Sequence, residues 1–267
     1  MLKDITLGQY FPGKSILHRL DPRAKLILLI VYIVTLFLCK FLVSYGIMLL
    51  FLVVCVAVSG ISPKVIFRGM KPLLFILAFT AALNIFYTPG TILGQWWIFR
   101  VTAEGLWNAG FMVIRIFMLI TGTFLLTYTT SPIMLTDALG RLMSPLAKIR
   151  VPVHELSMMM TIALRFIPTL IEETDKIMSA QKARGAEFGT GGLIRRAKAL
   201  LPLLVPLFVS AIRRADELAV AMESRCYHGG GGRTRLRQLR LTGEDFAVAL
   251  LCTLLFAGVI ILGVFGL

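Results

Sequence analysis

The stretch "GQYFPGKS" at residues 8–15 contains the residue types of a phosphate-binding loop. It matches the pattern G-x-x-x-x-G-K-[ST], in which backbone N–H groups cradle phosphates, a Lys reaches the outer phosphates and a hydroxyl holds Mg²⁺. That chemistry requires a buried strand before the loop and a long helix after it. Only seven residues precede Gly8, however, and Pro22 follows Ser15 by seven residues. The four variable positions are bulky and include a proline, which has no N–H. We therefore expect no nucleotide site in this segment.

The other side chains that could do chemistry are scattered along the sequence. Its three His lie far apart, and its four Cys have neither a pairing pattern nor metal-ligand spacing. Glu172, Glu173 and Asp175 form an acidic group, but no His or Cys lies near them in sequence to complete a site. We therefore expect this chain to be no enzyme, with no catalytic residues, no metal site and no cofactor of its own.

The composition is that of a protein that crosses the membrane several times. Of the 267 residues, 57% are hydrophobic and only 16% are charged, whereas soluble domains average about 25% charged residues. A net charge of +14 could indicate a nucleic-acid partner. In so apolar a chain, basic loops held at the cytoplasmic membrane surface explain the charge better. We predict that the protein contacts the lipid bilayer and no nucleic acid.

Long apolar runs predict an all-α fold with about five transmembrane helices. A spanning helix needs about 20 apolar residues, and the runs lie at residues 26–39, 41–60, 72–87, 106–128 and 246–267. With this alternation, the loops on one side of the membrane hold 25 of the 28 Lys and Arg, and those on the other side hold only Lys40 and Arg100. Because basic loops stay in the cytoplasm, we expect a multi-pass protein of the cell membrane with a cytoplasmic N-terminus.

The same topology divides the chain into three parts. Residues 1–130 would hold an N-terminal segment and four transmembrane helices, residues 131–245 a cytoplasmic domain, and residues 246–267 a C-terminal transmembrane helix. The middle part contains two apolar stretches, Leu156–Ile171 and Ala199–Ile212, which are short and interrupted by proline. We predict two long helices there, apolar at the start and charged at the end, that lie along or under the membrane.

Both predicted cytoplasmic helices end in a triplet with arginine between two small residues. The first triplet is Ala183, Arg184 and Gly185, and the second is Ser224, Arg225 and Cys226. Glycines follow each triplet, which is typical of a helix end. Each arginine could simply offset the helix dipole. Two such triplets on paired helices favour docking instead, since a guanidinium between small residues can enter a groove and form bidentate pairs with carboxylates.

The stretch from "SPLAKIRVPVHELSMMM" through "QKARGAEFGTGG" to "ESRCYHGGGGRTR" resembles the transmembrane T component of energy-coupling-factor transporters, and so does the opening "GQYFPGKSILHRLDPRAKL". The resemblance covers nearly the whole chain. It implies a coupling subunit of an importer with two ABC-type ATPase subunits, which bind the ATP, and a separate substrate-binding membrane S subunit for a vitamin or similar micronutrient. It also implies that Ala183-Arg184-Gly185 docks on one ATPase and Ser224-Arg225-Cys226 on the other.

Two other functional classes fit the sequence less well. A self-contained secondary transporter or channel should have acidic or polar ion sites inside its spans, but the predicted spans contain no Asp or Glu and a single charged residue, Arg115. Structural pairing explains Arg115 better than transport chemistry does. A membrane enzyme would need a cluster of His or carboxylates near the bilayer surface.

Cys226 of the second triplet stands where the family has Gly. Gly takes positive φ at no cost, whereas Cys does not. The sequence therefore leaves open whether the second helix ends with the same backbone geometry as the first.

Overall fold

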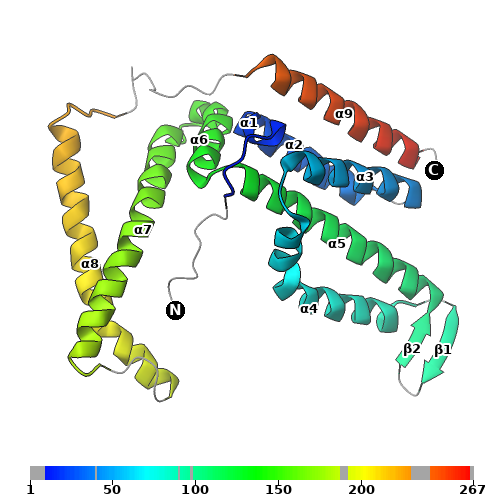
Figure 1. Ribbon diagram of the computed structural model, residues 1–267, viewed down its shortest axis with the longest axis horizontal. Coiled ribbons are helices and arrows are strands. Elements are labelled where there is room, and N and C mark those ends of the chain that lie inside the picture. The colour runs from blue at the N-terminus through cyan, green and yellow to red at the C-terminus, as the bar shows by residue number, and fades with distance from the viewer. Residues whose placement is uncertain are drawn as a thin grey trace. The chain divides into compact units, whose positions relative to one another are not determined.

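The computed structural model of the chain describes residues 10–39, 41–89, 91–96, 99–186, 192–229 and 241–264. These residues form two compact units. The membrane unit consists of residues 10–135 and 241–264, and the coupling unit of residues 136–186 and 192–229. The described residues are overwhelmingly helical (Figure 1), which confirms the all-α prediction.

The membrane unit is built around long apolar helices. Its elements are α1 (Ile16–Arg19), α2 (Pro22–Leu38), α3 (Leu42–Ser59), α4 (Pro63–Tyr87), β1 (Ile92–Trp96), β2 (Phe99–Thr102), α5 (Ala103–Thr129) and α9 (Gly243–Val264). Four of these helices, α3, α4, α5 and α9, are long and apolar enough to cross a membrane. The fifth predicted span corresponds to α2, which has 17 residues. The prediction of about five spans is therefore close to the observed set.

Local sequence signals set the boundaries of these helices. Asp21 caps α2 by accepting the Arg23 N–H at 2.8 Å, and Pro22 occupies the first helical position, where no N–H is needed. Gly60 ends α3 at a φ of 72°, a left-handed conformation that glycine adopts readily. Thr102 caps α5 by accepting the Gly105 N–H. These residues mark the starts of α2 and α5 and the end of α3.

A short antiparallel hairpin between α4 and α5 was not predicted. Strand β1 pairs with β2 from Ile92 opposite Thr102 to Trp96 opposite Phe99. Aromatic and β-branched residues occupy two of the five positions of β1 and three of the four positions of β2, and these types favour extended pairing. This strand pattern is short and lies between two long apolar runs, so the helix pattern of those runs hid it in the sequence.

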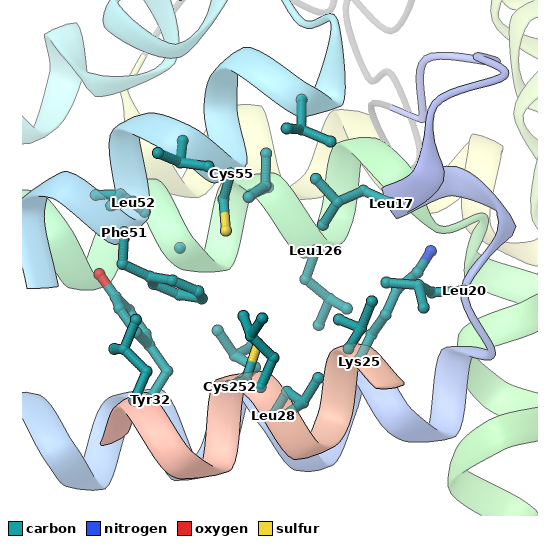
Figure 2. A pocket seen from close by; sticks show the side chains of 18 of the residues that line it. Leu17, Leu20, Lys25, Leu28, Tyr32, Phe51, Leu52, Cys55, Leu126 and Cys252 are labelled. Atoms are coloured by element: carbon teal, nitrogen blue, oxygen red, sulfur yellow. The ribbon is translucent and has the colours of Figure 1, made fainter. Parts of the chain in front are cut away.

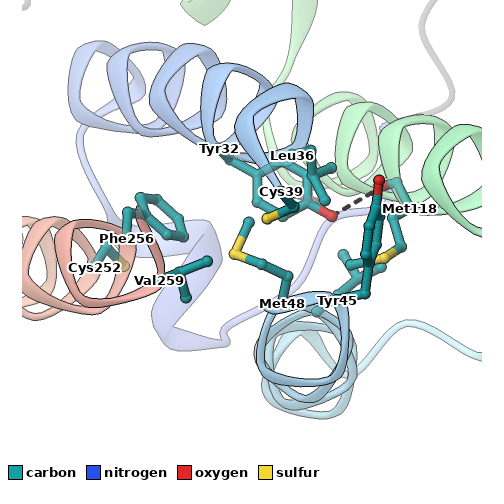
Figure 3. Close-up of a cluster of buried hydrophobic side chains, with 10 residues drawn as sticks. Tyr32, Leu36, Cys39, Tyr45, Met48, Met118, Cys252, Phe256 and Val259 are labelled. Atoms are coloured by element: carbon teal, nitrogen blue, oxygen red, sulfur yellow. Dashed lines mark hydrogen bonds between the residues drawn. The ribbon is translucent and has the colours of Figure 1, made fainter. Parts of the chain in front are cut away.

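Two apolar clusters hold the membrane unit together. The larger one joins α2, α3, α5 and α9 through ten buried residues (Figure 3), namely Tyr32, Leu36, Cys39, Tyr45, Met48, Leu52, Met118, Cys252, Phe256 and Val259. The Tyr32 hydroxyl, buried in this cluster, donates to the Met118 carbonyl at 3.2 Å. A second cluster joins α3, α4 and α5 around Met70 and Tyr128. Helix α9 is thus packed on α2 and α3 although some 200 residues separate them in sequence.

A buried polar network joins the starts of α2 and α9. Asp245 accepts the Asp21 N–H at 2.7 Å and the Thr242 N–H at 2.7 Å. Lys25 donates to the Thr129 carbonyl at 3.2 Å, at the end of α5. Burial opposes ionisation of Asp21, but hydrogen bonds from Arg23 and the Arg23 charge outweigh it, so the pKa of Asp21 lies below its ordinary value. The network therefore fixes three helix ends together.

The coupling unit contains the two long helices that the sequence predicts. After α6 (Pro132–Leu142), which begins in the membrane unit, come the 3₁₀ helix η1 (Ser144–Ile149), α7 (Val153–Ala183) and α8 (Leu193–Glu223). Helix α6 packs closely on α7, because a Cβ added at Gly140 would lie 2.2 Å from the Ser157 Oγ. Neither α7 nor α8 is among the candidate membrane spans of the described chain.

Candidate functional site

The first arginine triplet forms a glycine-capped end of α7. Ala183 is the last helical residue, Arg184 is the cap, and Gly185 has a φ of 86°. The Gly185 N–H donates to the Lys182 carbonyl at 3.0 Å, and the Ala186 N–H donates to the Gln181 carbonyl at 3.0 Å. These two hydrogen bonds define a Schellman motif, which satisfies the last carbonyl groups of the helix. The triplet therefore has a fixed backbone shape.

The second triplet has the same backbone geometry at the end of α8. The Cys226 N–H donates to the Glu223 carbonyl at 2.8 Å, and the Tyr227 N–H donates to the Met222 carbonyl at 3.0 Å. Cys226 occupies the position of Gly185 and has a φ of 56°. The question that cysteine raised at this position is answered: the helix ends in the same way. A non-glycine residue in this conformation costs about 1–2 kcal/mol.

Both arginines are available for an external partner. Arg184 and Arg225 are exposed, as are the small residues on either side of each. Among the described residues, neither guanidinium has a hydrogen bond or an ion pair. A guanidinium with five free donors is suited to carboxylates in a groove. Each helix end thus presents a hydrogen-bonded turn whose arginine has no partner within the described part of the chain.

Helices α7 and α8 are joined where they cross. Glu173 of α7 accepts a hydrogen bond from the Ser210 hydroxyl and forms an ion pair with Arg214 at 2.8 Å. The side chains of Glu173 and Arg214 are 22% and 34% exposed, so solvent only partly screens this pair. The Gln181 amide also donates to the Pro202 carbonyl at 3.5 Å. We call Glu173, Ser210 and Arg214 the crossing clasp.

The crossing places the two triplets at opposite ends of the helix pair. Residue 173 lies against 210 and residue 181 against 202, which is an antiparallel register (Figure 1). Arg184 lies 11 residues after Glu173, and Arg225 lies 11 residues after Arg214. With about 1.5 Å of rise per residue, each arm is about 16 Å long and the arginines lie up to about 33 Å apart. The structure does not bring the triplets together.

The arms beyond the clasp are continuous helix. The prolines inside α7 and α8 are Pro168, Pro202 and Pro206, and each precedes the clasp in sequence. No proline occurs from 173 to 184 or from 210 to 225. Because interior proline removes a hydrogen bond and bends a helix, both arms are stiffer than the segments before them.

Helix α8 also exposes an apolar face. Its exposed residues include Leu201, Leu204, Val205, Phe208, Val209 and Ile212. Their spacing of three and four residues places them on one side of the helix. An exposed apolar stripe this long is typical of a surface that is covered by another protein or by lipid.

The structure also locates the other residues that the sequence drew attention to. Ser15 precedes the four-residue α1, so no long helix follows the apparent phosphate loop, and Gly8 lies outside the described residues. Arg115 donates to the Tyr45 hydroxyl at 2.8 Å and to the Cys39 carbonyl at 3.2 Å. Arg115 is therefore paired within the membrane unit, as structural pairing predicts.

Sequence reasoning missed the crossing clasp, although a signal was present. Glu173 and Arg214 stand at the same distance before the two arginines and carry opposite charges. Aligning the two triplets would have revealed this relation. The antiparallel contact between α7 and α8 was still needed to show that the two residues meet.

The sequence of this chain is similar to those of known transport proteins. Residues 13–236 match the family described as CbiQ, cobalt transport protein. The energy-coupling factor transporter transmembrane protein EcfT of Clostridium kluyveri is 53% identical over 98% of this chain and 97% of its own length. Those of Thermosediminibacter oceani and Bacillus subtilis are 51% identical (96% of this chain, 97% of theirs) and 48% identical (93% and 94%).

The comparisons confirm the resemblance drawn from the opening segment and from the long stretch between residues 144 and 235. Identity near 50% extends over nearly the full length of both chains in each comparison. The relatives are membrane components of transporters, which agrees with the apolar helices of the membrane unit. The chain belongs to the family of energy-coupling factor transporter transmembrane proteins.

Proposed function

We propose that this chain is the coupling subunit of an importer, and that it transmits ATP-driven motion from two ABC-type ATPase subunits to a substrate-binding membrane S subunit. Residues 183–185 dock on one ATPase and residues 224–226 on the other. The observation that carries this proposal is the pair of matching helix ends, each with an exposed arginine that bonds to no other described residue. The cargo is a vitamin or similar micronutrient.

The crossing clasp links the two docking ends mechanically, so that they move together. The ion pair between Glu173 and Arg214 joins the arms at equivalent positions, so a displacement of either end is passed to the other helix. The opposed arms suit two separate partners, because the arginines lie too far apart to enter one groove. ATP binding that brings the two ATPases together would change the angle between α7 and α8.

The exposed apolar face of α8 suits the S subunit and the membrane surface. Lipid and a membrane protein offer the apolar contacts that Phe208 and its neighbours lack in this chain. In this arrangement the N-terminus and residues 131–245 lie in the cytoplasm, because the basic residues concentrate there. Helices α7 and α8 then lie between the ATPases and the S subunit.

The charge-reversal variants Arg184→Glu and Arg225→Glu test this proposal. Each variant is co-expressed with the S subunit and both ATPases, and the complex is purified in mild detergent. Removing one partner of a buried charge pair costs about 2–5 kcal/mol, so each reversal should weaken retention of its own ATPase by about 30-fold or more. Lys176→Glu, an equal charge change on an exposed α7 residue eight positions before Arg184, is the control.

The proposal predicts that each reversal releases one ATPase and that the control releases neither. If both reversals retain the two ATPases and ATP-driven uptake is unchanged, the triplets are ordinary helix ends and the proposal is wrong. Uptake by this chain alone in liposomes would favour a self-contained transporter instead.

A further inference from the structure

The membrane unit contains an elongated apolar cavity that the coupling role does not use. It measures about 460 Å³ and lies among α1, α2, α3, α5 and α9 (Figure 2). Its lining on α3 runs from Ile47 to Val58, a length of about 16 Å of helix. The rings of Phe51 and Phe256, whose centroids are 5.2 Å apart, line the cavity and both lie near the Tyr32 ring. Lys25 lies toward the opposite end.

The polar groups of the wall are already bonded within the protein. The Tyr32 hydroxyl donates to the Met118 carbonyl, and the Thr129 hydroxyl donates to the Leu125 carbonyl at 2.8 Å. Lys25 donates to Thr129 and Thr130 at 3.2 and 3.1 Å. The wall therefore presents mainly hydrocarbon and thiol groups. A cavity needs several polar partners to hold water, and an apolar void of about 150 Å³ already prefers apolar ligands.

The cavity is open on its α3 and α9 sides. Leu50 and Val54 of α3 and Leu251 of α9 line it and are also exposed, Leu251 to 63%. Both helices are candidate membrane spans, so the opening faces the region that lipid occupies.

Lys25 lines the cavity, and two further basic residues lie close in sequence to the wall at its Lys25 end. Leu17 and Leu20 of the α1 segment contribute to the wall there. Lys14 and Arg19, which flank Leu17 in sequence, are exposed. Cations at the edge of an apolar cavity suit an acyl chain that carries an anionic headgroup. Each surface Lys or Arg contributes about 1 kcal/mol to attraction by anionic lipid.

We propose that this cavity binds one acyl chain of an anionic phospholipid. The chain lies along α3 between Lys25 and Phe51, and the headgroup lies near Lys14 and Arg19. The lipid belongs to the cytoplasmic leaflet, an assignment that rests on the orientation under the proposed function. The bound chain fills the space between α3 and α9 and keeps the membrane unit packed.

Photoreactive phospholipids test this site in the intact four-subunit complex. The complex is reconstituted into nanodiscs that contain phosphatidylglycerol with a diazirine in one acyl chain. After illumination, mass spectrometry locates the adducts. We expect adducts on residues 47–58 of α3 and 248–256 of α9, the segments that line the cavity. Phosphatidylcholine with the same diazirine chain should label these segments about 30-fold less, because Lys14 and Arg19 each contribute about 1 kcal/mol to attraction by an anionic headgroup.

Two substitutions on α9 separate the cavity from the lipid-facing surface. Leu251→Trp narrows the opening and should reduce cavity adducts about ten-fold, the effect of excluding roughly two methylenes. Leu254→Trp is the control, because Leu254 is equally exposed at 65% but does not line the cavity. Cys55→Phe, within the wall, should act like Leu251→Trp and provides a second test if tryptophan points outward.

Three results would overturn the proposal. The first is labelling that is unchanged by both Leu251→Trp and Cys55→Phe, which would place the lipid elsewhere. The second is equal labelling by the two phospholipids, which would refute the anionic headgroup. The third is crosslinking of the cavity residues to the S subunit in place of lipid, which would identify a protein helix as the occupant. Retention of both ATPases in each variant keeps these results separate from failure of the proposed function.

Discussion

Substitutions at the left-handed positions of the two triplet-bearing helix ends should have opposite effects on stability. Both have the same hydrogen bonds, but Gly185 stands at the left-handed position in one and Cys226 in the other. Replacing Cys226 by Gly removes about 1–2 kcal/mol of backbone strain. The larger conformational entropy of Gly in the unfolded chain opposes this by about 0.4–1 kcal/mol. Cys226→Gly should therefore stabilise its helix end by about 0.5–1 kcal/mol, and Gly185→Ala should destabilise the other end similarly.

Hydrogen exchange measures these changes at the capping amides. The Tyr227 amide, which donates to Met222, should gain about two- to five-fold protection in Cys226→Gly. The Ala186 amide should lose protection by a similar factor in Gly185→Ala. Cys226→Ala is the control, because it removes the thiol but keeps the strained backbone, and it should leave protection unchanged. Lower protection in Cys226→Gly, or the gain appearing equally in Cys226→Ala, would refute the reasoning.

Three further predictions concern packing within each unit. Glu173→Gln should destabilise the purified protein by about 1 kcal/mol and lower its Tm by about 2–4 °C. Exchanging Glu173 and Arg214 should restore most of this lost stability in a double-mutant cycle. Additive losses of stability would count against the crossing clasp. Gly140→Ala should cost about 1–3 kcal/mol of stability, because the added methyl group collides with Ser157. Adding Ser157→Gly to this variant should relieve the collision. A Gly140→Ala variant of unchanged stability would mean that α6 and α7 are not so closely packed. Arg115→Met should lower the Tm, because it removes the hydrogen bonds to Tyr45 and to the Cys39 carbonyl. ATP-driven uptake should persist in this variant. Loss of uptake in a protein of unchanged Tm would instead give Arg115 a role in transport.

The sequence was sufficient for features that depend on composition and local pattern. Long apolar runs give the transmembrane helices, because a spanning segment must satisfy its backbone within itself. The two triplets could be placed at helix ends because glycine-rich segments follow them. The change at Cys226 was recognised as a departure from a glycine position, and its conformation followed once the backbone was known.

Features that depend on contacts between distant segments could not be predicted in this way. The network at Asp21 and Asp245 joins residues 224 positions apart, and no local pattern connects them. The pairing of Glu173 with Ser210 and Arg214 required the antiparallel register of α7 and α8. The apolar cavity is likewise lined by residues from five elements, and these residues look like ordinary lipid-facing positions in the sequence.

Site-specific crosslinking from the two helix ends tests the docking account most directly. A photoreactive amino acid is placed at Lys182 or at Glu223, exposed residues two positions before Arg184 and Arg225, so that both arginines are retained. In the assembled transporter, position 182 should crosslink to one ATPase subunit and position 223 to the other. Crosslinks to the S subunit or lipid alone, with no ATPase adduct from either position, would contradict the account.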